Sequence, residues 1–351
     1  MPAPKVISIA TVLPEHEVWM VDILEIARLW VSEKDPVFQR KVDRIFRNSG
    51  VKKRYTVLPI ADTFKPMTLD AKNGIYRTKI LDYAEQAVRD ALTQAHLTAQ
   101  DIDCLIVTSC TGHMSPSIDA FLMNRMEMKP SVQRLPVMEM GCIGGLAGLI
   151  YAENYLRAYP DKKVALVTAE LTSITFQNDD FSWANVVSSA IFGDGIACAI
   201  LGDTPENRPE IRASSMYHFK DSIDLLGFDL SSTGFRMVLD KHLPERISEQ
   251  FENFVSPILE QAHWKLEEID HFLVHPGGEK ILRNIEALLQ PVGKRLDSSR
   301  AVLHEMGNIS SATILFILKS YLDRSIPSGK KALLLGFGPG LTAASILLEW
   351  Q

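Results

Sequence analysis

The stretch Glu139-Met140-Gly141-Cys142-Ile143-Gly144-Gly145 is the part of the chain from which the fold is best deduced. An apolar run, 135–138, precedes it, and a segment with helical apolar spacing, 146–156, follows it. This order predicts a strand, a tight glycine turn and a helix that begins next to a thiol. The positive end of a helix dipole favours a thiolate, and glycines allow another group to approach closely. Cys142 is therefore a candidate nucleophile, although most cysteines in apolar surroundings are inert core residues.

Composition narrows the class of protein. The 351 residues are 46% hydrophobic and carry a net charge of −6, which suits two fused half-domains and gives no overall basic surface for nucleic acid. No run of 18 apolar residues predicts a membrane span, and the N-terminus does not resemble a signal peptide, so we expect a cytoplasmic protein. The four cysteines form neither a disulfide framework nor a zinc motif, and no metal site is predicted.

The second half of the chain repeats the first. Residues 88–107 and 255–274 align without gaps and share eight of twenty residues. The stretch 139–143, Glu-Met-Gly-Cys-Ile, aligns with 305–309, Glu-Met-Gly-Asn-Ile, so Cys142 and Asn308 hold equivalent positions. The first half also carries about twenty additional residues, 172–191, which are candidates for substrate or partner contacts.

Strands and helices alternate in both halves, 1–209 and 210–351, which predicts an α/β protein with mostly parallel strands. Equivalent strand-to-helix turns of the two copies would face each other. His275 directly follows an apolar strand, at the kind of strand end where α/β proteins form their sites. We therefore expect Cys142, His275 and Asn308 to converge.

These three side chains suit acyl transfer. A thiolate next to an imidazole is a typical acyl-carrying nucleophile. His275 and Asn308 could donate hydrogen bonds to a thioester carbonyl and stabilise an enolate formed there. Structural alternatives exist, because a histidine at a strand end is often a hydrogen-bonded structural residue and an asparagine at a helix start is often an N-cap.

A basic cluster stands out near the N-terminus. It is either a solvated helix face or a docking site for the phosphates of an acidic ligand, and it consists of Arg44, Arg47, Lys52, Lys53 and Arg54.

Several motifs together resemble the type III polyketide synthases, the chalcone synthase-like family with a thiolase fold, in a bacterial or fungal style. They are Ser109-Cys110-Thr111-Gly112 with Pro116-Ser117, Met140-Gly141-Cys142, Phe192-Gly193-Asp194-Gly195, Thr233-Gly234-Phe235, His275-Pro276-Gly277-Gly278, Gly307-Asn308-Ile309-Ser310-Ser311 and Gly336-Phe337-Gly338-Pro339-Gly340. The resemblance implies a thiolase-like fold in which the two duplicated βα halves pack as a layered α/β/α/β/α core.

The resemblance also implies site residues. Cys142 would carry the acyl chain, and His275 and Asn308 would bind the thioester carbonyl, with His275 helping to keep Cys142 as a thiolate. Phe192 would abut the malonyl carboxylate and assist its loss, since an apolar face disfavours the charged group. Phe235 matches a second aromatic residue at the pocket mouth, although core packing is its plain alternative.

The implied activity is that of an acyltransferase, a homodimer that uses coenzyme A thioesters directly and needs no metal or other cofactor. It would condense malonyl-CoA repeatedly onto an acyl-CoA starter held on Cys142 and cyclise the product to a pyrone or resorcinol. Cys110 occupies a pocket-lining position that is threonine in plant relatives and cysteine in some bacterial naphthalene-forming ones. Small side chains at Thr172 and Thr175 would leave room for a long acyl starter.

Three alternatives remain open on sequence alone. A fatty-acid-type ketoacyl synthase shares the Cys, His and Asn residues but condenses once, onto a carrier protein. A tetrahydroxynaphthalene-type enzyme uses malonyl-CoA only. A non-catalytic thiolase-fold scaffold would not need the intact trio, which argues against it.

Overall fold

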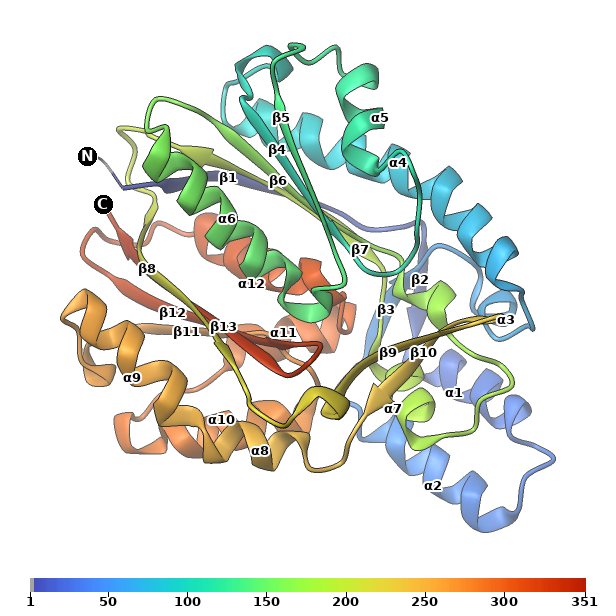
Figure 1. The fold of residues 1–351 in the computed structure, drawn as a ribbon. Helices are drawn as coiled ribbons and strands as arrows, with labels where there is room; N and C mark the ends of the chain where they lie inside the picture. The colour runs from blue at the N-terminus through green and yellow to red at the C-terminus, as the bar shows by residue number, and fades with distance from the viewer. Residues whose placement is uncertain (1–2) are drawn as a thin grey trace.

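The computed structural model describes residues 3–351 and contains a nine-stranded mixed sheet flanked by helices (Figure 1). In spatial order its strands are β11 (His271–Val274), β12 (Lys331–Gly338), β13 (Thr342–Trp350), β8 (Pro209–His218), β1 (Lys5–Val12), β7 (Gly195–Gly202), β6 (Val164–Glu170), β4 (Cys104–Ser109) and β5 (Gln133–Met138). The two halves of this sheet meet at β1 and β8, through the single pair Lys5 and Glu210.

Helices and sheet halves form five layers. Two central helices, α6 (Gly144–Ala158) and α12 (Thr313–Leu322), lie between the sheet halves and share one core with both (Figure 1). The outer face of the first half packs against α4 (Leu69–Gln94) and α5 (Ile118–Arg125). The second half packs against α8 (Leu243–Glu249), α9 (Phe251–Ala262), α10 (Glu279–Leu289) and α11 (Asp297–Met306). The predicted α/β/α/β/α arrangement is therefore confirmed.

The prediction of mostly parallel strands is wrong. Within the nine-stranded sheet three pairings are parallel, β4–β5, β4–β6 and β11–β12, and five are antiparallel. The connection between β12 and β13 explains one antiparallel pairing. Only the three residues 339–341 join these strands, and so short a connection permits antiparallel pairing alone. The equivalent strands of the first half, β6 and β7, are also antiparallel, but residues 171–194 replace the short turn.

The duplication extends to individual interactions. Asp103 Oδ2 accepts a hydrogen bond from the backbone N–H of Lys163 at 2.9 Å, and Asp270 Oδ2 accepts the equivalent bond from Lys331 at 2.9 Å. These aspartates precede equivalent strands, so one polar contact sets the start of two strands in each half.

A smaller group of elements covers one end of the layers. The helices α1 (Met20–Trp30), α2 (Pro36–Arg47), α3 (Ile60–Thr63) and α7 (Trp183–Ile191) enclose an aromatic-rich core beside the short pair β2 (His16–Trp19) and β3 (Lys53–Thr56). Next to them, β9 (Leu226–Ser231) and β10 (Gly234–Leu239) form a separate hairpin (Figure 1). Within residues 3–351, no helix is long and apolar enough to cross a membrane.

Candidate active site

Cys142 lies in a 3₁₀ turn, Gly141–Ile143, that leads directly into α6. The two glycines after this turn allow a close approach by the turn before α12. A Cβ added at Gly144 would lie 2.8 Å from Ser311 Cβ, and one at Gly145 would lie 2.3 Å from the backbone oxygen of Ser311. The Gly-Gly pair therefore lets the two equivalent helix starts, one from each half, come into direct contact beside the thiol.

Asn308 is held by the segment that carries Phe192. The two residues form an isolated parallel β-bridge, in which Asn308 N–H donates to Ile191 O at 2.8 Å and Gly193 N–H donates to Asn308 O at 3.0 Å. The Asn308 side-chain oxygen accepts a hydrogen bond from the backbone N–H of Ser310 at 2.8 Å. Because its oxygen is engaged in this way, the side-chain NH₂ is the group that Asn308 can offer to a ligand.

His275 follows β11 and is 1% exposed. Its backbone N–H donates to Leu335 O at 2.7 Å, whereas neither ring nitrogen has a hydrogen-bond partner within the described chain. A buried ring with both nitrogens unpaired is unusual for a structural histidine. This observation argues against the structural alternative for His275.

The predicted trio lies around one cavity of about 40 Å³. Its lining includes Cys142, His275, Asn308 and Phe192, with apolar residues of the second half around them. Four separate chain segments thus bring a thiol, an imidazole, an amide and an aromatic ring to the same space.

Burial affects the ionisation of both Cys142 and His275. Burial raises the pKa of the Cys142 thiol to about 12, and hydrogen bonds from Ser310 and Asn308 lower it less strongly. Burial also lowers the pKa of His275 to about 3. Burial thus opposes the effect of the helix start on Cys142, and the expectation of a thiolate stays a prediction. A neutral imidazole can accept the thiol proton as the reaction proceeds.

Cys142 also borders a second cavity, of about 20 Å³, on the side of the first half. Cys110, Thr172 and Thr175 line it together with Phe192, and their roles toward a substrate stay predictions. The Cys110 sulfur lies 3.3 Å from Ser310 Oγ and 3.5 Å from Glu170 Oε1, and burial next to Glu170 raises the pKa of this thiol well above its ordinary value.

Glu170, the last residue of β6, was missed by the sequence analysis. Its carboxylate is fully buried and accepts hydrogen bonds from Cys110 N–H at 3.1 Å, from Thr111 Oγ1 at 2.9 Å and from the Ser311 hydroxyl. Burial raises its pKa to about 7. The one available signal was an acidic residue at the end of an otherwise apolar strand, a position at which α/β proteins form sites.

Phe235 does not line either cavity. It lies on β10, and its ring packs edge-on against Phe228 with centroids 6.2 Å apart. Phe228 lines the cavity with Thr175, so Phe235 supports the wall from behind. The expected place of Phe235 at the pocket mouth stays a prediction.

An open cleft of about 450 Å³ leads to the thiol. It shares Ile191, Leu239, Leu243, Gly277 and Ile281 with the Cys142 cavity, so the two spaces adjoin. The cations that line the cleft are Arg44, Lys241, Lys280 and Arg283.

Most of the predicted basic cluster lies elsewhere. Lys53 pairs with Glu17 at 2.6 Å, and Arg54 is buried, donating to Ser189 O and Phe192 O at 2.7 Å. Of the five predicted cations, Arg44 alone lines the cleft. Strand alternation explains Arg54, since β3 turns every second side chain inward. Within residues 3–351, no group of three His, Cys, Asp or Glu side chains could hold a metal ion.

Comparison with known proteins identifies the family. The model of the N-terminal domain of chalcone and stilbene synthases matches residues 3–205, and the model of their C-terminal domain matches residues 210–350. The chain belongs to the chalcone and stilbene synthase family. It is thus a type III polyketide synthase, an enzyme of the acyltransferase type.

Bacterial members are among its relatives. The chain is 32% identical to 1,3,6,8-tetrahydroxynaphthalene synthase from Streptomyces coelicolor, over 97% of this chain and 90% of that protein. It is also 32% identical to phloroglucinol synthase from Pseudomonas fluorescens, over 88% of both. The crystal structure of the Streptomyces coelicolor synthase superimposes with a TM-score of 0.93 at 30% identity, covering 99% of each chain. This chain and the Streptomyces coelicolor synthase therefore share the thiolase-like fold over almost their whole length.

Proposed function

We propose that this type III polyketide synthase condenses malonyl-CoA repeatedly onto an acyl group held on Cys142. In the loading step the Cys142 sulfur attacks the thioester carbonyl of the donor while His275 accepts the thiol proton. The tetrahedral intermediate collapses to an acyl-Cys142 thioester, and the proton leaves with the coenzyme A thiol. The unpaired ring nitrogens of the buried His275, which lines the same cavity as Cys142, suit the role of proton acceptor.

The condensation step uses the same cavity. His275 and the Asn308 NH₂ donate hydrogen bonds to the thioester carbonyl of malonyl-CoA, and the apolar face of Phe192 disfavours its carboxylate. Carbon dioxide leaves, the electron pair passes into an enolate, and the enolate carbon attacks the acyl carbonyl on Cys142. The lengthened chain departs on coenzyme A as the Cys142 sulfur is released, and reloading begins the next cycle.

We propose that the open cleft binds the coenzyme A portion of both substrates. Arg44, Lys280 and Arg283 supply positive charge for its phosphates, and the apolar residues shared with the inner cavity lead the thioester arm to Cys142. We assign no part of this role to Lys52 and Arg54, because neither lines the cleft.

A short starter fits the cavities better than a long acyl chain. Thr172 and Thr175 separate the cavity at Cys110 from a further one of about 20 Å³. Phe64 and Phe176 line that further cavity, and their rings pack 4.4 Å apart. These two aromatic rings close the space beyond the threonines to a long hydrocarbon. We therefore favour malonyl-CoA as both starter and extender, with cyclisation to an aromatic product, over the long-chain pyrone or resorcinol route.

We also propose a homodimer that forms through β5. This strand is the edge of the nine-stranded sheet, four of its six residues are exposed, and Leu135 is 39% exposed. An exposed edge strand requires protection from uncontrolled pairing, which a second copy would provide. Light scattering of the purified protein should give twice the chain mass, and a monomer would contradict this proposal.

The observation that carries the proposed function is the convergence of Cys142, His275, Asn308 and Phe192 on one cavity. The test is incubation with malonyl-CoA, alone and with a series of acyl-CoA starters, without any carrier protein. Mass spectrometry should find products of at least two condensations, and Cys142→Ala should form none. Strict dependence on a carrier protein, or a single condensation, would instead support a ketoacyl synthase.

A further inference from the structure

The segment after Thr175 is fixed in place by side-chain hydrogen bonds. The buried Asn185 donates to Gln177 O at 2.8 Å and to Asp180 O at 2.6 Å, and its side-chain oxygen accepts from Gln177 N–H at 3.3 Å. Asn178 donates to Phe64 O at 2.6 Å. These bonds attach residues 176–182, part of the additional segment of the first half, to α7 and to Phe64, the residue that follows α3. This segment is therefore a rigid support.

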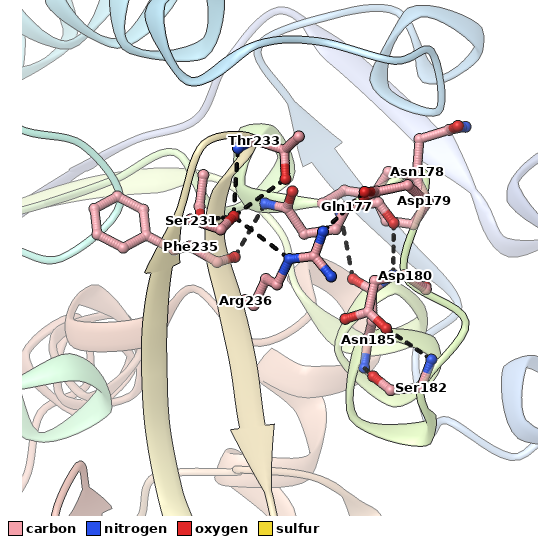
Figure 2. Close-up of polar contacts among 12 residues, drawn as sticks. Gln177, Asn178, Asp179, Asp180, Ser182, Asn185, Ser231, Thr233, Phe235 and Arg236 are labelled. Atoms are coloured by element: carbon pink, nitrogen blue, oxygen red, sulfur yellow. Dashed lines mark hydrogen bonds and ion pairs between the residues drawn. The ribbon is translucent and has the colours of Figure 1, made fainter.

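Gln177 joins this support to the β9–β10 hairpin (Figure 2). Its side-chain NH₂ donates to Thr175 O at 2.8 Å and to Phe235 O at 3.1 Å, and the residue is 1% exposed. Both partners are carbonyl oxygens, which accept only, so the nitrogen of the amide must face them. The amide oxygen of Gln177 is buried without a partner among the described residues.

The unpaired oxygen shows what the amide contributes. An apolar side chain of similar size would fill the same space without burying an unpaired acceptor. A glutamine at position 177 is therefore explained by the two hydrogen bonds that its side chain donates, and not by the space that it fills.

The two carbonyls belong to two segments that line the second cavity beside Cys142. Thr175 lies on one wall, while the hairpin supplies Phe228 and Met237 to the other. The hairpin is separate from the large sheet. Within residues 3–351 its two side-chain hydrogen-bond links to 176–182 are Gln177 and the exposed ion pair of Arg236 with Asp179 at 2.8 Å.

The backbone at Gly234 brings the hairpin close to Gln177. Its φ of +126° favours glycine, and an added Cβ would lie 2.9 Å from Gln177 Nε2. Beneath it, the buried Lys72 donates to Phe176 O at 2.6 Å. The hairpin and the support are thus in contact at the point where Gln177 bridges them.

We infer that Gln177 is a specificity-determining positioning residue: it fixes the gap between the Thr175 wall and the hairpin wall, and thereby the chain length at which the polyketide is cyclised and released. This inference rests on the proposed function. Gln177 touches no reacting atom, so it acts on the product distribution and not on the loading of Cys142.

The test compares three variants with malonyl-CoA as substrate. Gln177→Met keeps the volume and removes both donors, and Gln177→Glu keeps the shape while directing a carboxylate at two carbonyls. Arg236→Gln is the matched control, because it cuts the exposed link on the same hairpin. In both Gln177 variants the fraction of the wild-type product should fall about fivefold in favour of other chain lengths, with loading of Cys142 unchanged. Arg236→Gln should give the wild-type profile.

Hydrogen exchange of residues 226–239 provides a second measurement that does not require turnover. It should be faster in Gln177→Met than in Arg236→Gln. A wild-type product profile in folded Gln177 variants, or an equal change in Arg236→Gln, would overturn the inference while leaving the proposed function intact. If the wild-type protein itself forms no condensed product, the proposed function fails and the inferred role in chain length fails with it.

Discussion

Phe192 and Asn308 are paired backbone to backbone in a parallel β-bridge that joins the two halves of the chain. One residue offers an apolar ring and the other an amide to the same cavity. Because both hydrogen bonds of this bridge are buried main-chain contacts, the spacing of ring and amide is set by the fold and not by side-chain flexibility.

Gly193→Ala should disrupt this bridge. A Cβ at Gly193 would lie 2.4 Å from the backbone oxygen of Met306, which cannot move without displacing the neighbouring Asn308. We expect a loss of about 1–3 kcal/mol in the free energy of unfolding, typical of overpacking, and a large fall in condensation rate. Urea denaturation and a product assay measure the two effects.

Gly74→Ala is the matched control, since no atom lies within 4 Å of a Cβ at this position in α4. It should stabilise the protein slightly, by roughly 0.5–1 kcal/mol, and leave turnover unchanged. Equal behaviour of the two alanine variants would show that the bridge does not position the site.

Glu170→Gln should change how stability depends on pH. Burial raises the pKa of Glu170 from 4.5 to about 7 in the folded protein. Below 4.5 the carboxyl is protonated in both states. As pH rises from 4.5 to 7, the unfolded chain ionises first, so the free energy of unfolding falls, by roughly 3 kcal/mol at most, and then levels off. Denaturation across this range should show that the wild-type protein loses stability relative to the variant as pH rises. Parallel curves would contradict the raised pKa.

Phe64→Leu should widen the range of starters. Phe64 lines the small cavity beyond Thr172 and Thr175, so a smaller side chain extends the space available to an acyl chain. We expect kcat/KM for medium- and long-chain acyl-CoA starters to rise several-fold, at a cost of roughly 1–2 kcal/mol in stability. Phe181→Leu, in the same aromatic group but outside the cavity, should not raise it. Efficient use of long starters by the wild-type protein would refute the preference for a short starter.

Arg44→Glu should weaken substrate binding. Arg44 lines the open cleft, and reversing its charge should raise KM for malonyl-CoA about tenfold, equivalent to about 1.4 kcal/mol, more at low than at high salt. Lys52→Glu reverses a charge of the same sequence cluster outside the cleft and should leave KM near its wild-type value. If Lys52→Glu raised KM more than Arg44→Glu, the coenzyme A site would lie near Lys52 and not in the open cleft.

The trio could be predicted because the internal repeat aligns Cys142 with Asn308 and because His275 follows an apolar strand. Glu170 could not, since its partners come from two segments that are distant in sequence, 110–111 and Ser311, and the hydrogen bonds to them leave no sequence pattern. Strand direction was also beyond prediction, because an apolar run is equally compatible with parallel and antiparallel pairing. The thiolate expectation rests on the helix start, which is visible in the sequence, whereas the burial that opposes it is not visible there, so this expectation stays a prediction. The boundary at residue 209 stays a prediction.

Intact-protein mass spectrometry after brief exposure to malonyl-CoA tests the central claim most directly, with peptide mapping to locate the modified residue. The account predicts a covalent acyl adduct on the peptide that contains Cys142, and no adduct in folded Cys142→Ala. An adduct carried by another residue, or undiminished acylation of Cys142→Ala, would contradict it.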